Sequence, residues 1–122
     1  MIFFRAHRQL LLRKELILEF ITFALAIGFI SALKGQVILL TIVLILLSVI
    51  ANRVWHQKHD IFFYITGAIL GPLSEIVCTN FGVWRYAHPT FFSIPLWLPF
   101  AWGLAAVLIT RIAETFVKIE KR

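Results

Sequence analysis

Charged residues are scarce in this sequence: Asp, Glu, Lys and Arg together make up 15% of its 122 residues. A soluble domain usually has about a quarter charged residues and about half apolar ones. Here 61% of the residues are hydrophobic. So little polar surface excludes a soluble globular enzyme, a secreted disulfide scaffold, a disordered chain and a coiled coil. The composition indicates a small polytopic membrane protein with a single domain over 1–122.

Cysteine is almost absent, since Cys78 is the one thiol and lies inside an apolar segment. One thiol excludes an intrachain disulfide and a thiolate metal site. His56 and His59 beside Asp60 form another candidate for metal binding. Two imidazoles and one carboxylate are a weak ligand set, and histidine is ordinary at a membrane border. The sequence therefore predicts no metal and no cofactor.

Acidic residues are the rarer sign of charge: six Asp and Glu against twelve Lys and Arg give a net charge of +6. Such an excess is typical of nucleic-acid-binding proteins. Here, however, the basic residues lie at the ends of apolar segments, where they set topology and attract anionic lipid headgroups. We therefore expect membrane lipids as partners at the cytoplasmic face, and no nucleic acid.

Four apolar runs approach the roughly 20 residues that a helix needs to cross a hydrocarbon core of about 30 Å. We expect membrane spans over 16–33, 37–51, 61–82 and 94–116. The first 14 residues mix basic and apolar side chains. This mixture favours either a basic flank that fixes topology or an amphipathic helix in the headgroup layer. The predicted fold is an all-α bundle of four transmembrane helices with an N-terminal interfacial helix.

Lysine and arginine are distributed unequally between the two sides of this arrangement. One side has only Lys34 and Arg85, whereas the chain ends and the connector 52–60 carry most of the others. The positive-inside rule then places both termini in the cytoplasm. We expect a multi-pass protein of a prokaryotic plasma membrane.

The third span carries a stripe of small residues. Its members recur every three or four positions and therefore share one helical face: Gly67, Gly71, Ser74, Cys78 and Gly82. Small residues let another helix approach closely in lipid. We expect this face to pack on the fourth span, although it would equally serve a homo-oligomer or a larger membrane complex. The matching stripe of the fourth span is Gly103, Ala106, Thr110 and Ala113.

Glu75 lies well inside the third span, roughly 20 Å from its start at 1.5 Å per residue. A lone ionised carboxylate at that depth costs several kcal/mol, so Glu75 is protonated, paired or beside a polar cavity. Trp102 of the fourth span reaches a similar depth, and we expect the two side chains to face each other. The residues expected to cap a cavity there are Arg85, Tyr86 and His88. A purely structural hydrogen bond between helices is the alternative.

A second polar pair is predicted near the cytoplasmic ends of the first and fourth spans. Glu19 and Arg111 each lie about one turn inside their spans, so their depths match. We expect a structural salt bridge between them, because both side chains can also reach toward the interface. Glu114, three residues after Arg111, is within reach of the same guanidinium.

Two segments of the second half resemble a known pattern. They are Gly71-Pro-Leu-Ser-Glu75 with Gly82-Val-Trp-Arg-Tyr86, and Ile94-Pro-Leu-Trp-Leu-Pro-Phe-Ala-Trp102-Gly. Within residues 71–105 the chain is similar to the carotenoid-biosynthesis integral membrane family, whose members include carotenoid hydratases. The residues that match the family pattern are Glu75, Gly82, Trp84, Tyr86, Pro95 and Trp102.

The resemblance implies acid-catalysed chemistry on an isoprenoid-like lipid. A carboxyl kept neutral by burial donates the proton, and aromatic faces stabilise the carbocation. Glu75, Tyr86 and Trp102 would then be catalytic, and the implied substrate-binding residues are Trp84, Arg85, His88 and Trp97. The predicted function is to bind or modify such a lipid around Glu75. The competing hypothesis is a non-enzymatic accessory or structural subunit of a larger complex, whose working surface is the small-residue face.

Overall fold

The computed structural model describes residues 2–54 and 58–121 of the chain. These residues form four helices: α1 (Ile2–Leu33), α2 (Val37–Val54), α3 (Asp60–Asn80) and α4 (Leu98–Glu120). Each helix is long and apolar enough to cross a membrane, and the described residues contain no strand. The predicted all-α, polytopic architecture is confirmed.

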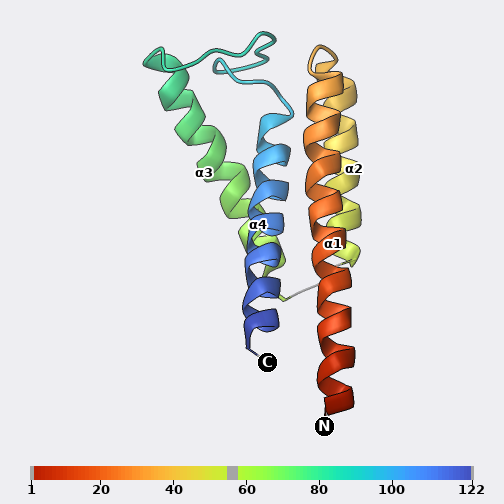
Figure 1. Ribbon diagram of the computed structural model, residues 1–122. Coiled ribbons are helices and arrows are strands. Elements are labelled where there is room, and N and C mark those ends of the chain that lie inside the picture. The colour runs from red at the N-terminus through yellow and green to blue at the C-terminus, as the bar shows by residue number, and fades with distance from the viewer. Residues whose placement is uncertain (1, 55–57, 122) are drawn as a thin grey trace.

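α1 is one continuous helix of 32 residues, so residues 2–14 are part of it and do not form the separate interfacial helix that the sequence predicted. The reason is local, because residues 2–27 contain neither proline nor glycine to interrupt the helix. At 1.5 Å per residue α1 is about 48 Å long, well beyond the hydrocarbon core. Its N-terminal turns extend past the C-terminal end of α4 (Figure 1).

α3 ends earlier than the sequence predicted, and Gly82 lies outside the helix. Phe81 caps α3, and Gly82 follows with a φ of 74°. The amide of Gly82 donates to the Thr79 carbonyl at 3.1 Å, and the amide of Val83 donates to the Cys78 carbonyl at 2.9 Å. This is a Schellman motif, which favours glycine at the left-handed position.

α4 begins at Leu98 rather than at residue 94. Phe91 and Ile94 form an isolated antiparallel bridge across a turn in which Phe92 and Ser93 have positive φ. Pro99 then occupies the first turn of α4, where its missing amide leaves no hydrogen bond unmade. The segment 94–97 therefore belongs to the loop.

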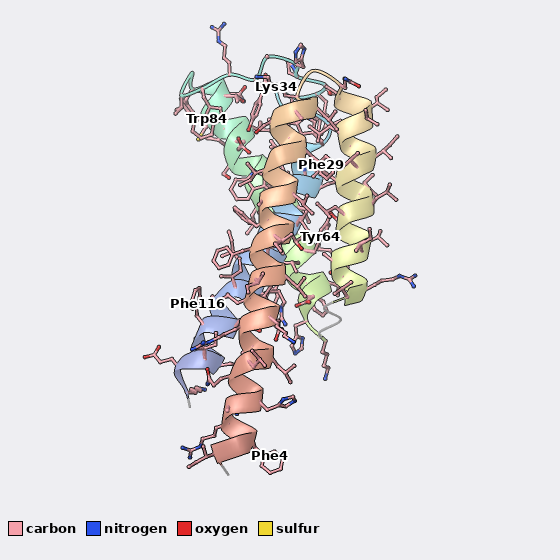
Figure 2. The ribbon with its side chains drawn as sticks, turned by 45° about the vertical axis from the view of Figure 1, so that its right-hand side comes forward. Phe4, Phe29, Lys34, Tyr64, Trp84 and Phe116 are labelled. Carbon is pink, nitrogen blue, oxygen red and sulfur yellow. The ribbon has the colours of Figure 1, made fainter. Side chains whose placement is uncertain are left out.

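α4 is the central helix, since it packs along α3, α1 and α2 (Figure 1). One core cluster combines α2, the loop and the start of α4: Leu40, Leu44, Ile94, Trp97 and Leu98. Large apolar side chains also cover the outside, such as Phe4 and Phe116 (Figure 2). Exposed apolar side chains are favourable here because lipid chains are as apolar as they are.

The two ends of the bundle differ. Both termini lie at one end, which we call the terminal end (Figure 1). The α1–α2 turn at 34–36 and the α3–α4 loop at 81–97 lie at the opposite end, which we call the loop end. Lys34 and Trp84 mark the loop end in Figure 2.

Candidate functional site

α3 and α4 approach each other closely at small residues. A Cβ on Gly71 would overlap the Trp102 indole, and a Cβ on Gly67 would lie 2.7 Å from the Trp102 carbonyl oxygen. The Ala106 methyl group packs on Gly67 from the same side. On α4, a Cβ on Gly103 would lie 2.7 Å from the Tyr64 ring. Four residues predicted for helix packing therefore lie in this contact, and each glycine makes room for a neighbour that a side chain would displace.

The rest of the predicted stripe has other surroundings. Ser74 is exposed, and its hydroxyl donates to carbonyls of its own helix, those of Leu70 at 3.0 Å and Gly71 at 2.8 Å. Cys78 is a half-buried free thiol. Gly82 follows the end of α3, so its place in the stripe is corrected: the Schellman motif turns the chain away before that residue.

Glu75 joins α3, α4 and the loop. Its side chain is buried, with 7% of the residue exposed. The Tyr86 hydroxyl donates to Oε1, and the Trp102 indole N–H donates to Oε2. The expected facing of Glu75 and Trp102 is therefore found, and Tyr86 completes the contact. Two donors offset the cost of burying a carboxylate.

The same two hydrogen bonds orient the Glu75 side chain. Each oxygen accepts one hydrogen bond, and the two donors hold the carboxyl group in one orientation. Burial, together with the hydrogen bond to Glu75 and its charge, raises the pKa of the Tyr86 phenol. Tyr86 therefore stays protonated and remains a hydrogen-bond donor.

Tyr86 also lines a cavity of about 430 Å³ at the loop end. The cavity lies between α1 and the α3–α4 loop, and its lining is Ile30, Ser31, Lys34, Arg85, Tyr86, Ala87, His88, Pro95 and Trp97. The loop meets the α1–α2 turn here, since a Cβ on Gly35 would lie 3.8 Å from the His88 Nε2. We call this space the loop-end cavity.

Trp97 forms a buried wall of the loop-end cavity. Only 7% of it is exposed, and its ring meets the Tyr86 ring edge to face with the centroids 6.3 Å apart. Its indole N–H is buried and has no hydrogen-bond acceptor among the described residues. A buried donor of this kind carries a desolvation cost that a polar partner would remove.

The structure thus brings most of the predicted site residues together, but not all around one space. Arg85, Tyr86, His88 and Trp97 line the loop-end cavity. Glu75 and Trp102 do not line this cavity. Glu75 accepts a hydrogen bond from the cavity residue Tyr86, and Trp102 donates to Glu75. Trp84 is also absent from the lining and is 42% exposed.

Sequence reasoning missed the contribution of α1 to this site. Ile30, Ser31 and Lys34 line the loop-end cavity, although the residues expected around a cavity all came from the second half of the chain. The available signal was charge, because Lys34 and Arg85 are the two basic residues predicted on one side of the membrane.

At the terminal end, the expected salt bridge between Glu19 and Arg111 is not formed. The Thr115 hydroxyl lies 2.9 and 3.0 Å from the two oxygens of the fully buried Glu19. Arg111 Nη2 instead lies 2.6 Å from Glu114 Oε2 and 3.5 Å from Asp60 Oδ1. The cause is tertiary, since the start of α3 places the carboxylate of Asp60 beside Arg111.

Within the described residues, no group of three His, Cys, Asp or Glu side chains is placed to hold a metal. His56, one member of the weak metal candidate, lies outside the described residues. Comparison of the chain with protein-family models, curated proteins and solved structures gives no significant match, so the resemblance to the carotenoid-biosynthesis family stays a prediction.

Proposed function

We propose that this chain is a small multi-pass membrane protein that binds an isoprenoid-like lipid in the loop-end cavity. One observation carries the proposal: Tyr86 is fixed by its hydrogen bond to Glu75 and at the same time lines the cavity. The buried carboxylate of Glu75 thus positions a side chain that lines the cavity. Intramembrane ionisable residues generally mark functional sites.

The size and lining of the cavity suit one end of an amphiphile. About 430 Å³ falls within the range of about 300–1,000 Å³ that small-molecule sites occupy. Ile30, Pro95 and the ring of Trp97 form apolar walls, while basic side chains border the same space. The rest of a long lipid would remain among the bilayer chains. The resemblance to the carotenoid-biosynthesis family supplies the isoprenoid class.

Binding is favoured over catalysis and over an accessory role by two contacts. Glu75 holds Tyr86 by a hydrogen bond and does not itself line the cavity, which makes Glu75 a positioning residue in this proposal. The small-residue face that an accessory subunit would present is covered by α4 at Gly67 and Gly71. That face is used inside the chain.

We place both termini in the cytoplasm of a prokaryotic cell and the loop-end cavity at the outer face of its plasma membrane. Two observations support this orientation. Both termini lie at the same end of the bundle, and most of the Lys and Arg residues lie at that end.

Photolabelling tests the proposal. The probe is farnesol carrying a diazirine, added to the purified protein in neutral detergent micelles. We expect labelled residues in 30–34 and 85–97, and competition by unlabelled farnesol but much less by a straight-chain alcohol of equal length. Ile30→Trp fills the cavity and should reduce labelling severalfold.

Ile27→Trp is the matched control, because Ile27 lies on the same helix, is 50% exposed and does not line the cavity. This variant should label like the original protein. Equal labelling of the two tryptophan variants, or labelling confined to lipid-facing residues of α1, would refute the proposed function.

A further inference from the structure

The loop-end cavity is bordered by cationic or titratable basic side chains and by no carboxylate. Lys34, Arg85 and His88 line it, and the lining contains no Asp or Glu. Between residues 20 and 113 the sequence has only two acidic residues, Asp60 and Glu75. Asp60 lies at the terminal end near Arg111, and the Glu75 oxygens accept from Tyr86 and Trp102.

Among the described residues, Lys34 and Arg85 form no ion pair with a carboxylate. The ion pairs found among the described residues both belong to Arg111. Lys34 and Arg85 come from distant parts of the chain, yet the fold brings both to one cavity. They are also the two basic residues on the side that the charge distribution leaves poor in Lys and Arg. Topology does not require them there, so a ligand is the simplest reason for their convergence.

The donors around the cavity match an anion with several oxygens. A guanidinium and an ammonium form short, charge-assisted hydrogen bonds to phosphate, and the guanidinium can do so in bidentate fashion. His88 adds an imidazole at the rim, and the buried indole N–H of Trp97 lies in the same wall without an acceptor among the described residues. Apolar walls continue behind these groups.

We propose that the loop-end cavity recognises a phosphate group, carried as the headgroup of the isoprenoid-like lipid. This inference rests on the proposed function for the lipid chain, but it makes a separate statement about the headgroup. Lys34 and Arg85 bind the phosphate oxygens, and Ile30, Pro95 and Trp97 contact the first carbons of the chain.

Thermal unfolding in neutral detergent micelles tests the headgroup, because a ligand that binds the folded state raises the unfolding midpoint. Three probes are compared: farnesyl phosphate, farnesol and inorganic phosphate. We expect farnesyl phosphate to act at concentrations about tenfold or more below those of farnesol, as charge-assisted hydrogen bonds to the headgroup predict. Inorganic phosphate distinguishes the source of the group. Stabilisation by inorganic phosphate at the same concentrations identifies the free ion, and stabilisation by farnesyl phosphate alone identifies a lipid headgroup.

The double variant Lys34→Gln with Arg85→Gln should respond equally to farnesyl phosphate and farnesol. The control, Arg5→Gln with Arg8→Gln, removes the same charge from two exposed positions of α1 at the terminal end and should keep the preference. A preference that survives in the Lys34 and Arg85 variant overturns the inference. So does equal action of the two lipids on the original protein, and in that case binding of farnesol leaves the proposed function standing. If none of the probes acts, both proposals fail.

Discussion

Glu75 is the residue at which α3, α4 and the loop between them meet. A carboxylate in lipid costs several kcal/mol unless donors surround it, and here the donors come from Tyr86 and Trp102. Trp102 in turn packs its ring on Gly71, so one polar contact and one close approach support each other. The result is a fixed position for Tyr86 at the edge of the loop-end cavity.

The Tyr86 phenol should ionise above its ordinary pKa of about 10. Burial and the contact with Glu75 both disfavour the phenolate. The folded state holds this proton more tightly than the unfolded state. The contribution of the protonated Tyr86 to the free energy of unfolding is therefore intact below about pH 10 and is lost as the pH rises through the folded pKa. The Tyr64→Phe variant leaves Tyr86 as the only tyrosine of the sequence. The ultraviolet absorbance of the phenolate, followed against pH in this variant, measures the pKa of Tyr86.

Adding Glu75→Gln to that background supplies the control for this titration. Glutamine keeps one of the two oxygen acceptors and removes the negative charge, so the pKa of Tyr86 should fall toward its ordinary value. An ordinary titration of Tyr86 in the presence of Glu75 would show that the two side chains are not in contact.

At the scale of elements, the α3–α4 pair depends on glycine at points of close approach. Gly71→Leu should destabilise the folded state by at least about 1–3 kcal/mol, because the added side chain overlaps the Trp102 ring. Gly28→Leu on α1 should not destabilise the folded state, because a Cβ at Gly28 meets nothing within 4 Å and leucine has the higher helix propensity. Denaturation in mixed detergent micelles compares the free energies of unfolding of the two variants. An equal loss of stability in both would contradict the close α3–α4 contact at Gly71.

At the scale of the whole molecule, four helices place both termini at one end of the bundle. Alkaline phosphatase, which is active only outside the bacterial cytoplasm, should be inactive when fused after Arg122 and active when inserted after Thr90 in the loop. The positive-inside rule gives this direction. The reverse pattern of activity would place the loop-end cavity on the cytoplasmic side.

The sequence by itself determined the four long apolar helices, because hydropathy is a local property of the chain. The same reasoning matched Glu75 with Trp102 and found the small residues at which α3 meets α4. Depth along a helix axis is counted in residues, so two helices that cross the same membrane can be aligned without knowing their rotation.

Only the tertiary structure decided which side chains meet in the other polar contacts. Arg111 pairs with Asp60 and Glu114 rather than with Glu19, and Lys34 joins Arg85 at one cavity. These contacts depend on how each helix is rotated about its axis and on where the loop folds back over the bundle. Packing among all four helices sets both, and the small-residue stripe encodes only the α3–α4 part of that packing.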